Sequence, residues 1–111
     1  MARHILRGFA LALLAFAPAS AQYKPRDVSG VVTDLRGNAL PKVAVQIENT
    51  RTLVVRSYIT GPDGRYHFDD LNDDIDFVLK AHYRRFWSKP KTLSKFNVEP
   101  HPMVVLVIPL D

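Results

Sequence analysis

Apolar and polar residues alternate with a period of two along most of the chain that follows residue 27, most clearly in residues 43–48 and 75–82. A period of two is typical of β-strands that bury one face. The pattern predicts strands at residues 28–33, 43–48, 53–60, 65–68, 75–82, 91–97 and 103–108. No stretch after the first 21 residues has a helical pattern.

Two of these segments carry more specific expectations. In residues 53–60 the alternation of Leu53, Val55 and Ile59 with more polar neighbours predicts a half-buried strand. The last strand, around residues 104–108, is apolar on both faces. We expect it to sit inside a sheet or to be covered, because an exposed edge of this composition favours aggregation.

The segments between the predicted strands have the composition of tight turns. Residues 36–38 read Arg-Gly-Asn, and residues 61–64 read Gly-Pro-Asp-Gly, which places proline at the second position of a turn. Short links of this kind join antiparallel strands. About seven short strands with such links indicate an all-β, two-sheet sandwich of immunoglobulin-like size.

Residues 1–21 have the three parts of a cleavable export signal. Arg3 and Arg7 make the start basic, residues 9–17 form an apolar run, and the segment ends in small side chains. The apolar run is too short for a membrane-spanning helix, which needs about 20 residues. We therefore expect no stable membrane insertion after cleavage and an exported, periplasmic or extracellular protein. Its expected divisions are the signal peptide 1–21, a flexible lead-in 22–27 and one domain 28–111.

Removal of the signal also changes the charge. The chain has 15 Lys and Arg and a net charge of +4; without Arg3 and Arg7 the net charge is +2. This small excess does not indicate nucleic-acid binding, which needs a concentrated basic face. The chain has no cysteine, which excludes disulfides and thiolate chemistry. The predicted domain must therefore be stabilised by packed apolar surface.

Four segments, in order, resemble the signature of carboxypeptidase regulatory-like domains. They are Val28–Asp34 (VSGVVTD), Gly37–Pro41 (GNALP), Val43–Ile47 (VAVQI) and Thr60–Phe68 (TGPDGRYHF), followed by Leu71. The resemblance implies a transthyretin-like β-sandwich, common on exported bacterial proteins, with a structural or interaction role and no chemistry of its own. Many members have a Pro-Gly-x-Tyr turn after the central leucine, whereas this chain has the acidic stretch 72–77, so the shape of that loop is left open.

The acidic stretch offers one candidate metal site. Asp70, Asn72 and Asp74 have the spacing that opens a calcium-binding loop, but Ile75 stands where that loop needs glycine and Ala81 where it needs an acid. The alternative is a solvated acidic loop. Histidines 67, 82 and 101 have no local ligand spacing, and none of the serines lies in a nucleophile elbow.

A basic and aromatic segment follows. Tyr83, Arg84, Arg85 and Phe86 combine residue types that often dominate binding interfaces, and we take them as candidate partner-binding residues. Arg84 and Arg85 are expected to be exposed. Trp87, the only tryptophan of the chain, is expected in the core.

These observations favour a non-catalytic exported module, without a cofactor, that binds an unknown protein or glycan at the bacterial cell envelope. A calcium-stabilised adhesion module is an alternative. A further alternative, from another class, is a transthyretin-related hydroxyisourate hydrolase. Such enzymes end in Tyr-Arg-Gly-Ser, whereas this sequence ends in Ile-Pro-Leu-Asp.

Overall fold

The computed structural model describes residues 24–111, so the expected signal peptide and the start of the lead-in lie outside the described residues. The described part contains only strands: β1 (Pro25–Thr33), β2 (Ala44–Asn49), β3 (Val55–Ile59), β4 (Arg65–Asn72), β5 (Phe77–Tyr83), β6 (Phe86–Trp87), β7 (Lys91–Leu93) and β8 (Met103–Val107). Residues 24–111 contain no helix of the length and apolarity that a membrane span requires.

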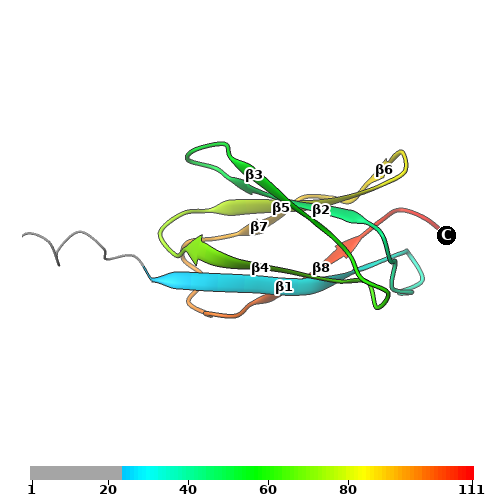
Figure 1. Cartoon of the computed structure of the whole chain (residues 1–111), viewed down its shortest axis with the longest axis horizontal. Helices are drawn as coiled ribbons and strands as arrows, with labels where there is room; N and C mark the ends of the chain where they lie inside the picture. The colour runs from blue at the N-terminus through cyan, green and yellow to red at the C-terminus, as the bar shows by residue number, and fades with distance from the viewer. Residues whose placement is uncertain (1–23) are drawn as a thin grey trace, which may run out of the picture.

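The strands form two sheets that pack face to face, one above the other in Figure 1. The first sheet has the order β4-β1-β8, in which β4 is antiparallel and β8 parallel to β1. The second has the order β3-β2-β5-β6, and β7 also pairs with β5. The predicted two-sheet sandwich is confirmed.

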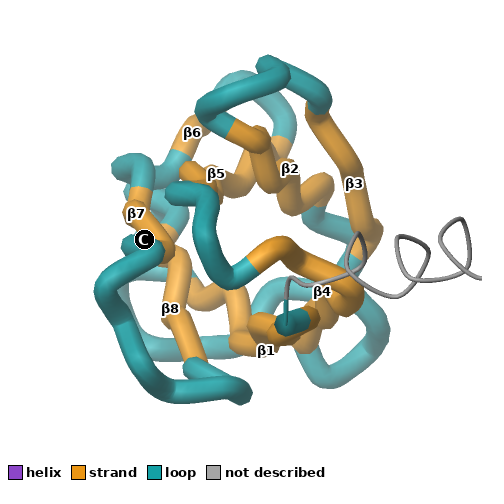
Figure 2. The backbone as a smooth tube through the Cα atoms, turned by 90° about the vertical axis from the view of Figure 1, so that its left-hand side faces the viewer, coloured by secondary structure: helices purple, strands orange, loops and turns teal. Residues whose placement is uncertain are grey.

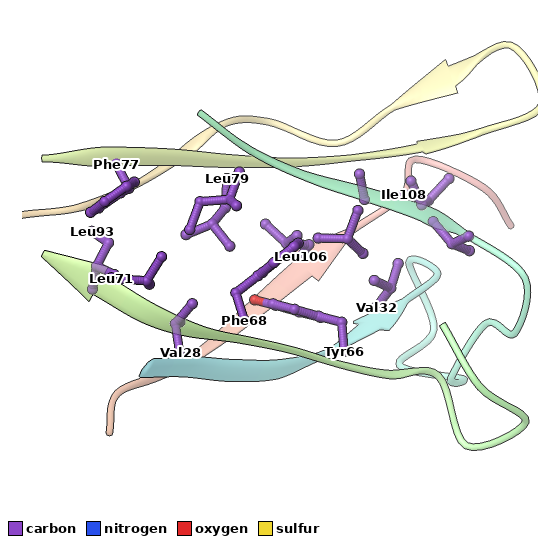
Figure 3. Close-up of a cluster of buried hydrophobic side chains, with 14 of the residues drawn as sticks. Val28, Val32, Tyr66, Phe68, Leu71, Phe77, Leu79, Leu93, Leu106 and Ile108 are labelled. Carbon is purple, nitrogen blue, oxygen red and sulfur yellow. The ribbon is translucent and has the colours of Figure 1, made fainter. Parts of the chain in front are cut away.

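The core lies between the sheets and follows the period of two. Val43, Val45 and Ile47 are at most 1% exposed, and the face of residues 75–82 that was expected to be buried points inward. Figure 3 shows side chains from both sheets filling the interior, from Phe77 and Leu93 at one end to Ile108 at the other. Full burial of one such aliphatic side chain stabilises the fold by roughly 1.5–3 kcal/mol.

The strands β4, β1 and β8 meet closely at Gly30. A Cβ atom at this position would lie 1.8 Å from the carbonyl oxygen of Val104 and 2.7 Å from the hydroxyl of Tyr66. That hydroxyl donates a hydrogen bond of 2.7 Å to the same carbonyl, passing over Gly30 from β4 to β8. The absence of a side chain in the central strand therefore permits a direct bond between its two neighbours.

The turn at residues 61–64 forms as its composition predicts. The flexible lead-in, in contrast, was expected to extend to residue 27 and ends earlier. The amide of Gly64 donates to the carbonyl of Gly61, which closes the predicted turn around Pro62. Strand β1, however, begins at Pro25, and Arg26 is 5% exposed. The Arg26 guanidinium donates to the carbonyls of Ile75, Ser94 and Asn97, so burial and hydrogen bonding fix a segment that composition alone marked as flexible.

Two strands lie in places that the pattern did not predict. All five residues of β3 are exposed, so the expectation of a half-buried strand at residues 53–60 was wrong. Strand β3 is the edge of its sheet, and its apolar residues project beyond the core. Strand β8 was expected inside a sheet or covered, but it is likewise an edge, and its outward residues Met103, Val105 and Val107 are exposed. The end-on view in Figure 2 shows β7 and β8 on one side of the sandwich and β3 and β4 on the other.

Candidate functional site

The predicted partner-binding residues form the tip of the β5–β6 hairpin. Tyr83 and Phe86 are cross-strand partners, and Arg84 and Arg85 make the two-residue turn between them. Each guanidinium lies over the ring next to it: Arg84 is 5.1 Å from the centroid of Tyr83 and Arg85 is 5.2 Å from that of Phe86. Both rings are partly buried against the core, and both arginines are exposed, as predicted.

The backbone of this turn is strained. Arg84 has a φ of 57°, in the left-handed region that a two-residue hairpin turn requires at its first position and that glycine normally occupies. A residue other than glycine in this region costs about 1 kcal/mol or more. The hairpin thus retains an arginine where glycine would fit with less strain.

Trp87 is on the surface rather than in the core. It is 43% exposed, which corrects the expectation that the only tryptophan fills the interior. Its ring stacks on its cross-strand partner His82, with centroids 4.0 Å apart and an interplanar angle of 7°. The ammonium of Lys80 lies 4.8 Å from the indole centroid. The indole points outward because His82, on the same face of β5, alternates with the buried Ala81.

A groove runs over the outer face of the second sheet beside this tryptophan. Its volume is about 650 Å³, and it is lined by Gln46, Glu48, Val55, Val78, Lys80, Trp87 and Pro90. Gln46 and Glu48 are half-buried, and within residues 24–111 neither side chain has a hydrogen-bond or ion-pair partner. The groove therefore combines polar groups available for a ligand with one aromatic ring. Sequence reasoning missed it, although the polar positions of the 43–48 alternation were a usable signal.

The acidic loop does not gather a set of calcium ligands. The side-chain oxygen of Asn72 accepts a hydrogen bond from the backbone N–H of Asp74, so this oxygen is already engaged within the loop. The carboxylate of Asp74 faces the guanidinium of Arg51 at 3.9 Å. Asp70 lies in β4 with a φ of 56°. In the part of the chain that the structure describes, no group of three or more His, Cys, Asp or Glu residues is placed to hold a metal ion.

Two histidines that are distant in sequence meet at one carboxylate. Asp27 of β1 accepts a hydrogen bond from Nδ1 of His101, and its other oxygen lies 3.7 Å from Nε2 of His67 on β4. The bond from His101 lowers the pKa of Asp27 below its usual value. No local spacing could have revealed this cluster, since the pairing of β1 with β4 and the contact of β1 with the loop before β8 bring the residues together.

The sequence matches the family model of the carboxypeptidase regulatory-like domain over residues 27–108. The chain belongs to the carboxypeptidase regulatory-like domain family. The match covers nearly the whole described sandwich, from β1 to the end of β8. A comparison with curated protein sequences finds no match.

Solved structures share the fold of this regulatory-like domain at low identity. The dioxygenase domain of a dioxygenase and carbohydrate-binding protein fusion from Streptomyces sp. SirexAA-E has a TM-score of 0.60 at 16% identity, covering 84% of each chain. Chlorocatechol 1,2-dioxygenase from Pseudomonas putida has a TM-score of 0.55 at 10% identity, covering 78% of this chain and 61% of its own.

The C-terminal domain of the shaft pilin spaA from Lactobacillus rhamnosus GG has a TM-score of 0.51 at 6% identity, covering 77% of this chain and 98% of the pilin domain. These likenesses concern the fold alone. They include enzymes and a pilin domain, so the sandwich by itself does not select a function. A function for this regulatory-like domain must therefore be inferred from its own surface residues.

Proposed function

We propose that this regulatory-like domain is an exported, non-catalytic module that binds a protein or glycan partner at the bacterial cell envelope, after removal of residues 1–21. The observation that carries the proposal is the β5–β6 hairpin tip, where Arg84 and Arg85 are exposed over two half-buried rings.

The tip has the physical properties of an anchor. Arginine and tyrosine are enriched among the residues that dominate binding energy. A guanidinium that already stacks on a ring is partly ordered before binding, which reduces the entropy lost in the complex. The left-handed Arg84 is consistent with retention of strain at a functional position.

A paired substitution tests this role. Arg84→Ala with Arg85→Ala removes both cations from exposed positions, so the free energy of unfolding should change by no more than about 0.5 kcal/mol. A partner retained from the native envelope fraction by the tagged wild-type domain should be lost. Arg36→Ala with Arg65→Ala makes the same change of charge elsewhere and should retain it. Unfolding of the Arg84/Arg85 variant, or equal retention by both variants, would contradict the proposal.

Export is tested separately. The full chain should yield a mature protein that begins at Gln22, detectable by mass spectrometry of the periplasmic fraction or the culture medium. A protein that retains its first residues inside the cell would contradict an exported role.

The groove over the outer sheet face favours glycan binding as a second candidate function. Aromatic rings bury the apolar face of a sugar, and unpaired amide and carboxylate groups such as those of Gln46 and Glu48 hydrogen-bond its hydroxyls. Trp87 is the only tryptophan, so its fluorescence reports directly on this groove. A panel of neutral hexasaccharides should include one that shifts the emission saturably in the wild type and not in Gln46→Ala with Glu48→Ala. Asn97→Ala with Glu99→Ala, which removes an exposed amide and an exposed carboxylate elsewhere, is the matched control.

A further inference from the structure

Strand β8 directs its backbone polar groups to two different sides. The amide of Ser29 donates to the carbonyl of Pro102, and the amide of Ile108 donates to the carbonyl of Thr33, so the even-numbered residues of this segment bond to β1. Because backbone groups alternate in a strand, the N–H and C=O groups of Met103, Val105 and Val107 point away from β1. The sheet order places no strand on that side in residues 24–111.

This unpaired edge is apolar. Met103 is 59% exposed, Val105 43% and Val107 39%. Proteins ordinarily protect an edge with charges, proline within the strand, a bulge or a covering loop. The strand Met103–Val107 has no charge and no proline, and its register against β1 is unbroken from Ser29 to Thr33. The edge therefore has the features of a template for another strand.

A groove of about 520 Å³ continues from this edge towards β7. It is lined by Leu35, Trp87, Lys89, Lys91, Val107 and Pro109. Four of these residues are apolar, the two charged ones are exposed lysines, and the lining has no acidic residue. A segment that pairs with β8 would therefore fit this groove best if it carried apolar side chains that contact the four apolar residues. It would also need carboxylates that reach the ammonium groups of Lys89 and Lys91.

We propose that the β8 edge is a docking site for an extended, acidic and apolar segment of a partner protein, which adds to the first sheet as a fourth strand. Main-chain hydrogen bonds to Val105 and Val107 would give affinity, and the groove with Lys89 and Lys91 would select the sequence. This inference goes beyond the proposed function, because it assigns a surface that the arginine tip does not include.

The charge of the groove favours such a segment over a second copy of this chain. Residues 102–110, which a second copy would present if two β8 edges paired, contain no acidic side chain. A symmetric pair of β8 strands would therefore bring no carboxylate from residues 102–110 to Lys89 and Lys91. An acidic strand neutralises both, and opposite charges across an interface fix register and suppress wrong partners.

A peptide titration followed by NMR tests the proposal. The probe is a capped ten-residue peptide of alternating valine and glutamate, added to the ¹⁵N-labelled domain, residues 22–111, at neutral pH. It should slow hydrogen exchange at the amides of Val105 and Val107 at least about tenfold, without an equal effect at the hairpin tip. The same peptide with lysine in place of glutamate should bind at least about tenfold more weakly. Absence of saturable binding by the glutamate peptide would overturn the proposal.

Charge reversal provides the decisive comparison. In Lys89→Glu with Lys91→Glu the preference should invert, so that the lysine peptide binds better. Lys24→Glu with Lys95→Glu makes the same change at the other end of the strands and should leave the preference unchanged. Both pairs are exposed, so neither variant should unfold. Equal preference in the two variants, or a dimer formed through β8 that excludes the peptide, would overturn the proposal.

Discussion

Strands β4 and β8 are the two edges of the same sheet, and they are built in opposite ways. The outward positions of β4 carry Arg65, His67 and Asp69, whereas those of β8 carry methionine and two valines. Strand β4 also contains a bulge, because its pairing with β1 shifts between Arg26 and Val28. Charges and bulges discourage further pairing. One edge is therefore protected, and the other is suited to receive a strand.

The largest loss of stability should come from adding a side chain to β1, the strand that lies between the two edge strands. Gly30→Ala would place a Cβ 1.8 Å from the carbonyl oxygen of Val104, so β8 or β4 must move. We expect a loss of about 3 kcal/mol or more in the free energy of unfolding, measured in urea. In Gly61→Ala the nearest atom is 3.5 Å away, and the loss should stay below about 1 kcal/mol. Similar losses at both sites would show that this close approach does not determine the position of β8.

A smaller loss of stability should follow from removing the hydrogen bond that joins β4 to β8. Tyr66→Phe removes the hydrogen bond to Val104 and should cost about 1 kcal/mol. Burial raises the pKa of Tyr66 above its usual value, so the hydroxyl stays protonated and the bond persists at neutral and mildly alkaline pH. Tyr58→Phe, on the exposed β3, should leave stability almost unchanged. A Tyr66→Phe domain as stable as the wild type would contradict a role for this bond.

The Asp27 cluster links β1, β4 and the loop before β8, and it should make stability depend on pH. The folded-state pKa of Asp27 is lowered, so its contribution is present above the unfolded value of 3.8 and is lost as the pH falls through the folded value. The melting temperature of the wild type should therefore decline more steeply below about pH 4 than that of Asp27→Asn. Parallel declines in both proteins would contradict the linkage.

The smallest effect on stability, with a clear effect on association, should come from protecting the open edge. Val105→Glu places a negative charge on the outward face of β8 and should change the free energy of unfolding by no more than about 0.5 kcal/mol. It should weaken binding of the valine and glutamate peptide, measured by the same NMR titration. His67→Glu, on the protected β4 edge, should not change binding of the peptide. Equal behaviour of the two variants would contradict the difference between the edges.

The sequence predicted the buried core of this fold better than its edge strands. Burial on one face imposes the period of two, so Val45 and Leu79 were placed correctly. The same pattern failed in residues 55–59, because alternation cannot distinguish a central strand from an edge strand whose side chains project beyond the core. The apolar residues 104–108 showed that β8 needed cover, but strand order depends on pairing between segments far apart in the chain.

The candidate sites were predictable to the extent that they are local. Arg84 and Arg85 were predicted to be exposed because arginine is rarely buried, and the structure adds that they form the tip of the β5–β6 hairpin. Trp87 was misplaced, since composition does not show which face of a strand an aromatic ring occupies. The meeting of Asp27, His67 and His101 depends on two strands and a loop that are far apart in the chain, and no spacing in the sequence encodes it.

Hydrogen exchange of the free domain tests the open edge most directly. The amides of Leu106 and Ile108, which face β1, should exchange slowly, whereas those of Val105 and Val107 should exchange at least about a hundredfold faster in the same strand. Such alternation would show that β8 is paired on one side and open on the other. Uniformly slow exchange along residues 104–108 would contradict it, because the edge would then be covered without a partner.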